Sequence, residues 1–157
     1  MNFPPLPSTI ESALAARGYA AATPVQAEVM QPEAAGRDLI VSAQTGSGKT
    51  IAFGIAMAGE LLADGDSVPY AEGPLALIIA PTRELALQVS RELGWLYGQA
   101  GGRIATCVGG MNPQQERQAL RAGANIVVGT PGRLRDHLER GALDLSALRV
   151  VVLDEAD

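Results

Sequence analysis

The stretch Ala43-Gln44-Thr45-Gly46-Ser47-Gly48-Lys49-Thr50 decides how the rest of the chain is interpreted. An apolar run precedes it and a helical pattern of apolar residues follows it, so it is predicted to join a strand to a helix. Its glycines let backbone N–H groups turn toward an anion, and the helix adds the positive end of its dipole. This pattern is typical of a phosphate-binding loop, with Lys49 on the β- and γ-phosphates and Thr50 on a magnesium ion.

The stretch departs from the strict phosphate-loop pattern at its first position, where alanine stands in place of glycine. A glycine-rich turn that merely caps a helix is the alternative interpretation, and the strand–turn–helix setting favours the phosphate loop. Lys49 is also the only lysine of a chain that uses arginine eleven times. A lysine ammonium is a compact point charge that suits phosphate.

The length, composition and net charge of the chain limit the number of domains and the class of protein. A chain of 157 residues, 47% of them apolar, is long enough for one folded domain. The net charge of −5 argues against a protein that coats duplex DNA, so any nucleic-acid contact must be made at a few defined points. No apolar run approaches the roughly 20 residues of a membrane helix, and no basic-then-apolar segment begins the chain. We therefore expect a cytoplasmic protein without a membrane segment.

Cys107 and His137 are the only residues of their types in the chain. One cysteine excludes an internal disulfide and a cysteine-based metal cluster. Cys107 lies in an apolar run, which predicts a buried, inert thiol. His137 lies in a helical pattern rich in charges, which predicts an exposed helix residue rather than a ligand.

Five apolar runs of strand length alternate with helical patterns. The predicted strands cover residues 38–42, 75–80, 103–108, 125–129 and 149–153. This alternation is typical of an α/β fold in which helices cover both faces of a parallel sheet. The apolar stripe of the helix after Pro81 makes Trp95 and Tyr97 packing residues.

The N-terminal part of the chain carries two helix-start signals. Ser8-Thr9-Ile10-Glu11 fits a capping box, and Gly18 is placed to end that helix. Thr23 followed by Pro24 combines a favoured N-cap with proline at the first helical position.

Unusual polar residues follow every predicted strand. In parallel α/β sheets ligands bind beyond the carboxyl ends of the strands. The helix starts at Thr82, near Gly110 and at Thr130 each offer further backbone N–H groups to an anion. Several anion sites along one edge favour a polyphosphate at one place and a nucleic-acid backbone at another.

Taken in order, these elements resemble the first RecA-like domain of a DEAD-box RNA helicase over essentially the whole chain. The matching elements are Gly18-Tyr19 through Thr23-Pro24-Val25-Gln26, Ala43 to Thr50, Pro81-Thr82-Arg83-Glu84-Leu85, Gly109-Gly110, Thr130-Pro131-Gly132-Arg133 and Asp154-Glu155-Ala156-Asp157. The resemblance implies a P-loop NTPase fold of the RecA-like type. It also implies an adenine-reading segment at 1–36 packed on a partial ATP-binding domain at 37–157.

The resemblance implies an adenine-nucleotide site. It places Gln26 on the adenine edge, where a carboxamide can pair with N6 and N7. It places Tyr19 near the base and Phe3 further upstream, with simple packing as the alternative for both. The implied cofactor-binding residues are Tyr19, Thr23, Gln26, Thr45, Gly46, Ser47, Gly48, Lys49 and Thr50.

The resemblance also implies the parts of ATP hydrolysis. Asp154 would hold Mg²⁺ together with Thr50, through water in the case of Asp154. Glu155 would orient or deprotonate the attacking water. The implied catalytic residues are Lys49, Asp154 and Glu155.

RNA is the partner that the resemblance implies for the remaining motifs. Backbone and hydroxyl contacts to phosphate and ribose carry little base information, so binding should be largely independent of sequence. The implied RNA-binding residues are Pro81, Thr82, Arg83, Gly109, Gly110, Thr130, Gly132 and Arg133.

Family members continue beyond the D-E-A-D element into a second RecA-like domain, which is absent here and is an expected partner of this one. Its arginines complete the ATP site, so we expect this chain alone to bind adenine nucleotide weakly and to hydrolyse it hardly at all. The strand after the D-E-A-D element would lie between the strand at 39–41 and the strand at 150–153. Without it we expect a gap in the sheet that is empty or filled from another chain, or else that this chain represents only part of a longer protein.

Two other functions are consistent with the same residues. One is another phosphate-loop enzyme, such as a small-molecule kinase or a GTPase, against which the adenine-reading Gln26 argues. The other is a nucleotide-gated module that binds RNA or a protein partner without catalysis. The missing second domain favours this module for the chain as given, whereas the intact Lys49, Asp154 and Glu155 favour an ATPase ancestor.

Overall fold

The computed structural model describes residues 6–19, 22–24, 26, 48–62 and 65–154. Within them, four parallel strands form one sheet in the order β2-β3-β1-β4. The strands are β1 (Ala76–Ile79), β2 (Ile104–Cys107), β3 (Ile126–Gly129) and β4 (Val150–Leu153). The parallel α/β sheet predicted from the sequence is confirmed for these four strands, whereas the strand expected at 38–42 lies outside the described residues.

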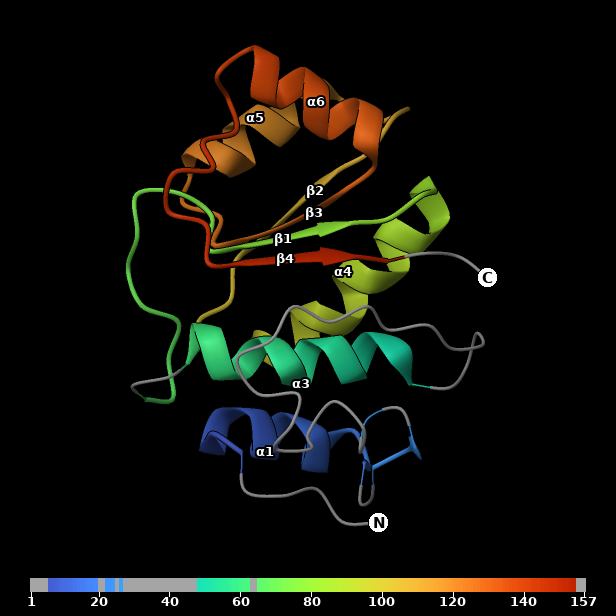
Figure 1. The fold of residues 1–157 in the computed structure, drawn as a ribbon, viewed down its shortest axis with the longest axis vertical. Helices are drawn as coiled ribbons and strands as arrows, with labels where there is room; N and C mark the ends of the chain where they lie inside the picture. The colour runs from blue at the N-terminus through green and yellow to red at the C-terminus, as the bar shows by residue number, and fades with distance from the viewer. Residues whose placement is uncertain (1–5, 20–21, 25, 27–47, 63–64, 155–157) are drawn as a thin grey trace.

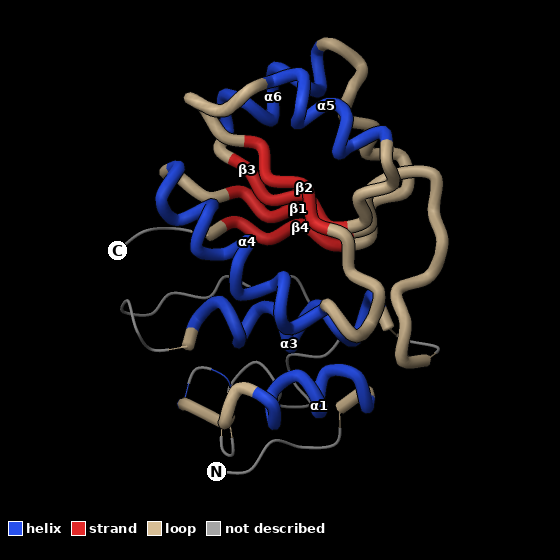
Figure 2. The backbone as a smooth tube through the Cα atoms, turned by 180° about the vertical axis from the view of Figure 1, so that it is seen from behind, coloured by secondary structure: helices blue, strands red, loops and turns tan. Residues whose placement is uncertain are grey.

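Helices cover both faces of the sheet (Figure 1). On one face lie α5 (Pro113–Arg121) and α6 (Pro131–Glu139). On the other lie α4 (Arg83–Tyr97), then α3 (Lys49–Leu61) and α1 (Ser8–Ala16), which Figure 2 shows from behind. This layering agrees with the expectation for a parallel sheet.

The two faces of the sheet have separate apolar cores because strand side chains alternate. Ala76 and Ile78 of β1 point to the larger core with α1, α3 and α4. Leu77 points to the smaller core, where it packs with Cys107 and with Leu134 of α6. At β4 that smaller core is incomplete among the described residues, because the side chains that alternate onto this face, at positions 151 and 153, are 58% and 56% exposed.

Helix α4 is the central layer of the larger core. Its buried residues Val89, Leu93 and Leu96 follow helical spacing, as the sequence predicted. Leu93 and Leu96 press on Gly54 of α3, and the Tyr97 hydroxyl donates a 2.6 Å hydrogen bond to the Gly54 carbonyl. Both Tyr97 and the half-buried Trp95 are packing residues, which confirms the prediction made for them.

The capping box expected at the start of α1 is wrong. The N-cap is Pro7 rather than Ser8, and Ser8 is the first helical residue. The Ser8 N–H donates to the Asp66 carboxylate at 2.8 Å, and Glu11 accepts from the Leu6 N–H at 3.1 Å. A carboxylate distant in the sequence therefore caps this helix, which local spacing could not reveal. The end of the helix is as predicted, with Gly18 at φ 79°.

Two further expectations concern the whole chain. Among the described residues, no helix combines the length and the apolar character needed to cross a membrane. Pairing between β4 and the strand expected at 38–42 falls outside the described residues. The gap in the sheet stays a prediction.

Candidate functional site

The carboxyl ends of the four strands meet at one edge of the sheet and in register. Ile79 pairs with both Gly129 and Leu153, and Cys107 pairs with Gly129. The segments that follow the strands therefore begin side by side, and the Asp154 N–H donates to the Ile79 carbonyl at 2.8 Å. The structure thus brings the motifs after β1, β2, β3 and β4 to one edge, as the alternation of strands and helices predicted.

Lys49 and Asp154 form an ion pair at this edge. The Lys49 Nζ lies 2.9 Å from the Asp154 Oδ1, and the two side chains are 16% and 3% exposed. The contact is an ion pair without the alignment of a hydrogen bond. A carboxylate as buried as this one is costly without a compensating charge. The predicted phosphate-binding lysine and the first acid of the D-E-A-D element are therefore energetically coupled.

Gln26 contacts Gly48 in the predicted phosphate loop. Its Oε1 accepts from the Thr23 N–H at 3.0 Å, and the Thr23 hydroxyl accepts from the Gln26 N–H at 3.4 Å. This reciprocal pair is a capping box, which bears out Thr23 as the N-cap. The Gln26 Nε2 also donates to the Gly48 carbonyl at 3.3 Å. Adenine recognition by this buried amide stays a prediction, and an adenine would have to compete with these bonds.

Gly48 requires the absence of a side chain for two reasons. Its φ is 85°, in the left-handed region, where it serves as the N-cap of α3. A Cβ at this position would run into the Gln26 amide and crowd the Thr23 hydroxyl. Gly48, in the predicted phosphate loop, is therefore fitted to the side chains of Thr23 and Gln26.

Tyr19 lies in an aromatic stack on the outer side of α4. Its ring and that of Trp95 are 5.6 Å apart at an interplanar angle of 28°, and the Arg17 guanidinium lies 5.0 Å from the Trp95 ring centroid. These contacts fasten the segment after α1 to the core. Stacking of Tyr19 near a base stays a prediction.

Part of the predicted nucleotide site falls on residues that the structure does not describe. Thr50 is half-buried in the first turn of α3, directly after Lys49. Phe3, Thr45, Gly46, Ser47 and Glu155 lie outside the described residues.

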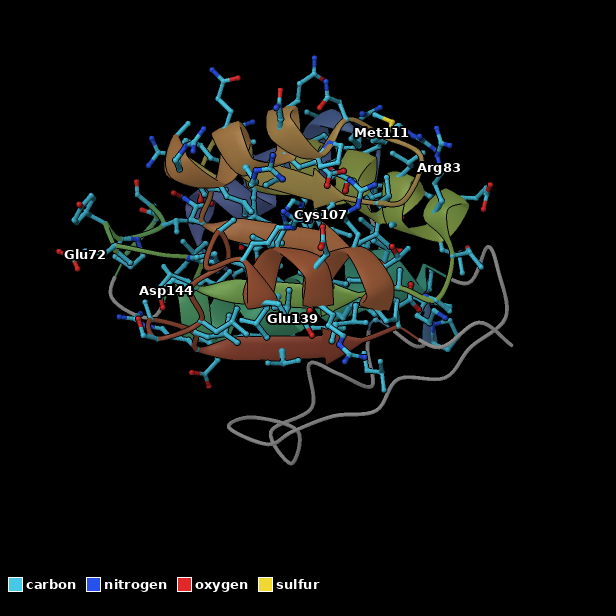
Figure 3. The ribbon with its side chains drawn as sticks, turned by 90° about the horizontal axis from the view of Figure 1, so that it is seen from above. Glu72, Arg83, Cys107, Met111, Glu139 and Asp144 are labelled. Atoms are coloured by element: carbon cyan, nitrogen blue, oxygen red, sulfur yellow. The ribbon has the colours of Figure 1, made fainter. Side chains whose placement is uncertain are left out.

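The first of three turns at the same edge precedes α4. Pro81, Thr82 and Arg83 are all exposed, and the Thr82 hydroxyl accepts from the Leu85 N–H at 3.3 Å as the N-cap. The Arg83 Nη2 lies 3.7 Å from the sulfur of Met111, and the two side chains meet beyond the strand ends (Figure 3).

The second turn follows β2 and contains Gly109 and Gly110, both exposed. Gly110 has a φ of 84°, and a Cβ there would lie 2.8 Å from the Arg83 Nη1. The left-handed backbone therefore favours glycine at this point, and the exposed Arg83 guanidinium lies close against it. Met111, which the sequence analysis did not single out, is 44% exposed at the end of this turn.

The third turn opens α6, with Thr130 half-buried and Gly132 exposed. Arg133 differs from Arg83, because its side chain is 14% exposed and points inward. Its Nη1 and Nη2 each donate to the Met111 carbonyl at 3.3 Å, and Nη1 also donates to the Glu116 Oε1 at 2.8 Å. The second and third turns are thus joined through one guanidinium.

Glu116 and His137 form a buried pair beneath these turns. Glu116 is 5% exposed on α5, and its Oε2 accepts from the Val108 N–H at 3.0 Å. His137 on α6 has its Nε2 2.8 Å from the Glu116 Oε1. The prediction that His137 is an exposed helix residue is wrong, since it is fully buried. It lies one turn after Arg133 and Leu134, on the face of α6 that packs on the sheet.

Spacing could have revealed this pair. Glu116 lies three residues after Pro113 and four before Leu120, and these three residues form the inward face of α5. A charged residue in an inward stripe is a signal for a buried partner.

Cys107 completes the cluster and is inert, as predicted. It is fully buried, and burial together with the Glu116 charge raises the pKa of its thiol to about 12. Its sulfur and the ligand atoms of Glu116 and His137 lie within 4.8 Å of one another. A metal would need the thiolate, and the Arg133 guanidinium already occupies the carboxylate. The cluster is therefore a hydrogen-bond network rather than a metal site.

The edge of the sheet thus carries two kinds of chemistry. The Lys49 ammonium and the Asp154 carboxylate can hold a polyphosphate and a hard cation between them. The three exposed turns offer backbone N–H groups and one exposed guanidinium to phosphates of a strand.

Comparison with known proteins gives the same family from both sequence and structure. The family model described as DEAD/DEAH box helicase matches residues 23–157. DEAD-box ATP-dependent RNA helicase 9 of Oryza sativa subsp. japonica is 45% identical over 150 residues, which cover 94% of this chain and 23% of the relative. ATP-dependent RNA helicase DeaD of Haemophilus influenzae is 46% identical over 154 residues, which cover 97% of this chain and 24% of the relative.

The fold is also found in a solved structure. A DEAD box protein from the hyperthermophile Methanococcus jannaschii superposes with a TM-score of 0.84 at 39% identity. The match covers 100% of this chain and 42% of that protein. The chain therefore spans about a quarter of the two curated relatives and less than half of the solved one.

Proposed function

The chain belongs to the DEAD/DEAH box helicase family, and from this we propose that the complete protein is an RNA-dependent ATPase that unwinds short RNA duplexes. The chain supplies the RecA-like domain that holds ATP and one stretch of RNA. The observation that carries the proposal is the Lys49–Asp154 ion pair, 2.9 Å long, at the sheet edge that also presents the three turns. Relatives named as ATP-dependent RNA helicases support it.

The residues at the ion pair fit Mg²⁺ and a triphosphate. Asp154 offers a carboxylate and Thr50 a hydroxyl, the hard oxygen ligands that Mg²⁺ prefers. When bound, Mg²⁺ neutralises charge that develops on the phosphates. Lys49 would exchange part of its contact with Asp154 for the β- and γ-phosphates, and Gly48 would keep the backbone close to them.

Glu155 is proposed as the residue that orients or deprotonates the attacking water. It follows Asp154 directly, so the two acids would face the same nucleotide from the end of β4. We assign different roles to the two acids. Asp154 forms an ion pair with Lys49, whereas a general base needs a free lone pair to accept the proton of the attacking water.

RNA is proposed to lie across the turns at 81–83, 109–110 and 130–132. Among these residues Arg83 is the exposed cation, and the other groups are hydroxyls and backbone N–H groups. Such contacts position a phosphate backbone without reading bases. We also propose that this chain alone hydrolyses ATP very slowly, since an arginine from another domain is worth about 10³–10⁵ in rate.

The test is phosphate release by this chain and by the complete protein, with and without single-stranded RNA. We expect RNA-stimulated release of about 1 per second or faster from the complete protein and almost none from the chain alone. Glu155→Gln in the complete protein should keep ATP binding and slow hydrolysis. An unstimulated ATPase would contradict RNA as the partner, and equal loss of binding and hydrolysis in the variant would give Glu155 a structural role.

A further inference from the structure

A buried carboxylate beneath the RNA-binding turns is the most informative feature that the proposed function does not use. Glu116 is bound by three donors, one from the end of β2 and two from α6. These are the Val108 N–H at the end of β2, the Arg133 guanidinium and the His137 ring. Both carboxylate oxygens are occupied, so the side chain has one arrangement in which all three donors are satisfied.

The direction of the His137 hydrogen bond follows from the geometry. The His137 Nε2 faces a carboxylate oxygen, which can only accept, so Nε2 donates. The Nδ1 is buried and has no hydrogen-bond partner among the described residues. The Arg133 guanidinium is the permanent positive charge beside Glu116, and the two form an ion pair of 2.8 Å.

This ion pair determines where Arg133 points. With Nη1 shared between Glu116 and the Met111 carbonyl, and Nη2 on the same carbonyl, the guanidinium spans α6 and the end of the turn at 109–111. Arg83 also lies against that turn, at Gly110 and at the Met111 sulfur. Two arginines thus contact the turn, and of these only Arg83 is exposed.

We propose that Glu116 and His137 are positioning residues for RNA binding, and that Arg133 acts through the Met111 carbonyl to hold the 109–111 turn rather than as an exposed phosphate ligand. The proposal rests on the proposed function, since it assigns residues to the same RNA surface. Glu116 fixes the orientation of the Arg133 side chain, and Arg133 fixes the position of the 109–111 turn. The turn then presents its N–H groups to the RNA.

The negative charge of Glu116 allows the proposal to be distinguished from a purely electrostatic effect on RNA affinity. Removing a carboxylate near bound RNA should strengthen RNA binding if long-range electrostatics alone operate. Removing Glu116 should weaken RNA binding if the carboxylate positions Arg133. The two explanations therefore predict opposite signs for one substitution.

The experiment measures the affinity of the complete protein for a fluorescent single-stranded RNA in the presence of a non-hydrolysable ATP analogue. Glu116→Ala should weaken RNA binding about tenfold, because three donors lose their acceptor. Glu116→Gln should keep part of the affinity, since its amide oxygen can still accept. The matched control is Glu139→Ala, which removes the same charge from a 63% exposed side chain of α6 and should leave affinity within about twofold.

Arg133→Lys is a second test, which retains the positive charge. A lysine cannot bridge Glu116 and the Met111 carbonyl as a planar fork does. RNA affinity should fall about as far as in Glu116→Ala, whereas ATP affinity without RNA should stay unchanged in every variant. In RNA-stimulated ATPase assays the RNA concentration for half-maximal rate should rise while the rate at saturating RNA is preserved.

Several results would overturn the inference. Equal or tighter RNA binding by Glu116→Ala would show that the carboxylate keeps Arg133 away from the RNA phosphates and does not position it for RNA binding. Full affinity in Arg133→Lys would make the arginine a simple point charge. Parallel loss of RNA and ATP binding would make the network merely structural. Absence of RNA binding in the unaltered protein would instead overturn the proposed function, and this inference with it.

Discussion

Lys49 and Asp154 lie more than 100 positions apart in the chain, and each needs the other in the folded state. Replacing Lys49 by alanine leaves Asp154, 3% exposed, without its cation. We expect two effects of Lys49→Ala: loss of measurable ATP turnover in the complete protein, and a drop in unfolding free energy of about 3 kcal/mol. Turnover is checked by phosphate release and stability by urea denaturation.

An exposed arginine provides the control for Lys49. Arg91→Ala removes the same charge from the exposed side of α4 and should leave turnover and stability close to those of the unaltered protein. Retained turnover in Lys49→Ala would remove the phosphate-loop interpretation.

The raised pKa values of Cys107 and Tyr97 predict how the stability of the fold depends on pH. Burial raises the pKa of the Cys107 thiol from 9.0 to about 12, and it raises the pKa of Tyr97 as well. Both groups are neutral when protonated, so the folded state keeps protons that the unfolded state loses above pH 9 to 10. Their contribution is therefore complete below pH 9 and declines as the pH rises toward 12.

The measurement is urea denaturation at pH 7.5, 9 and 10.5. Unfolding free energy should fall over this range, and Cys107→Ala should fall less steeply than the unaltered chain. With one lysine in the sequence, few other groups titrate here. A stability that is constant or rises to pH 10.5 would contradict the assignment. The Cys107 thiol should also resist alkylation until the protein unfolds.

Sequence reasoning at the residue scale succeeded where a residue acts through its backbone and failed where it acts through a distant partner. Gly48 and Gly110 were identified by their position in turns, and both have positive φ. His137 was misplaced, because its charged neighbours in the sequence describe the outer face of α6 and not its inner one. The spacing of α5 marks Glu116 as an inward residue, but its three donors come from other elements and could not be identified from spacing.

At the scale of elements, the packing of α3 on α4 gives a prediction with an internal control. A Cβ on Gly54 would lie 2.7 Å from Leu96 and 3.1 Å from Leu93, and both leucines are fully buried. A Cβ on Gly59, one and a half turns later in the same helix, meets nothing within 4 Å. The two positions share glycine's low helix propensity but differ in the space available.

Alanine should therefore have opposite effects at the two sites. Gly54→Ala should lower the unfolding free energy by about 1–3 kcal/mol through overpacking. Gly59→Ala should raise it by about 0.5–1 kcal/mol, since the helix gains propensity without a clash. Chemical denaturation of both variants measures this. A gain in stability at Gly54 would show that α3 and α4 are packed less closely than the structure has them.

The strands were predictable because buried parallel strands read as continuous apolar runs bounded by turn residues. All four described strands fall inside the predicted runs. The order β2-β3-β1-β4 was not predictable from those runs, since any one of them can pair with any other. The start of α1 was mispredicted for a related reason: its cap, Asp66, is 58 residues away from Ser8 in the sequence.

At the scale of the whole molecule, the net charge of −5 and the three turns together set how RNA binding should respond to salt. Arg133 is turned inward and Lys49 is paired with Asp154, which leaves Arg83 as the exposed cation of the predicted RNA-binding and nucleotide-binding residues that the structure describes. Backbone N–H groups of the turns would make the other phosphate contacts. On this basis we expect the three turns of the chain to contact about three phosphates of the RNA.

Each phosphate neutralised on a single strand contributes about −0.7 to the slope of log affinity against log salt. Arg83 is the one exposed cation among these residues, so we expect a slope near −0.7, which is about a threefold loss between 50 and 200 mM salt. Fluorescence anisotropy with this chain and with oligonucleotides of equal length but different sequence measures both the slope and its dependence on sequence. Affinities should agree within a few-fold among sequences, because the contacts are to the backbone. A slope near −7, or a strong preference for one sequence, would mean that RNA is bound by a larger basic surface or by base-reading side chains, and not by these three turns.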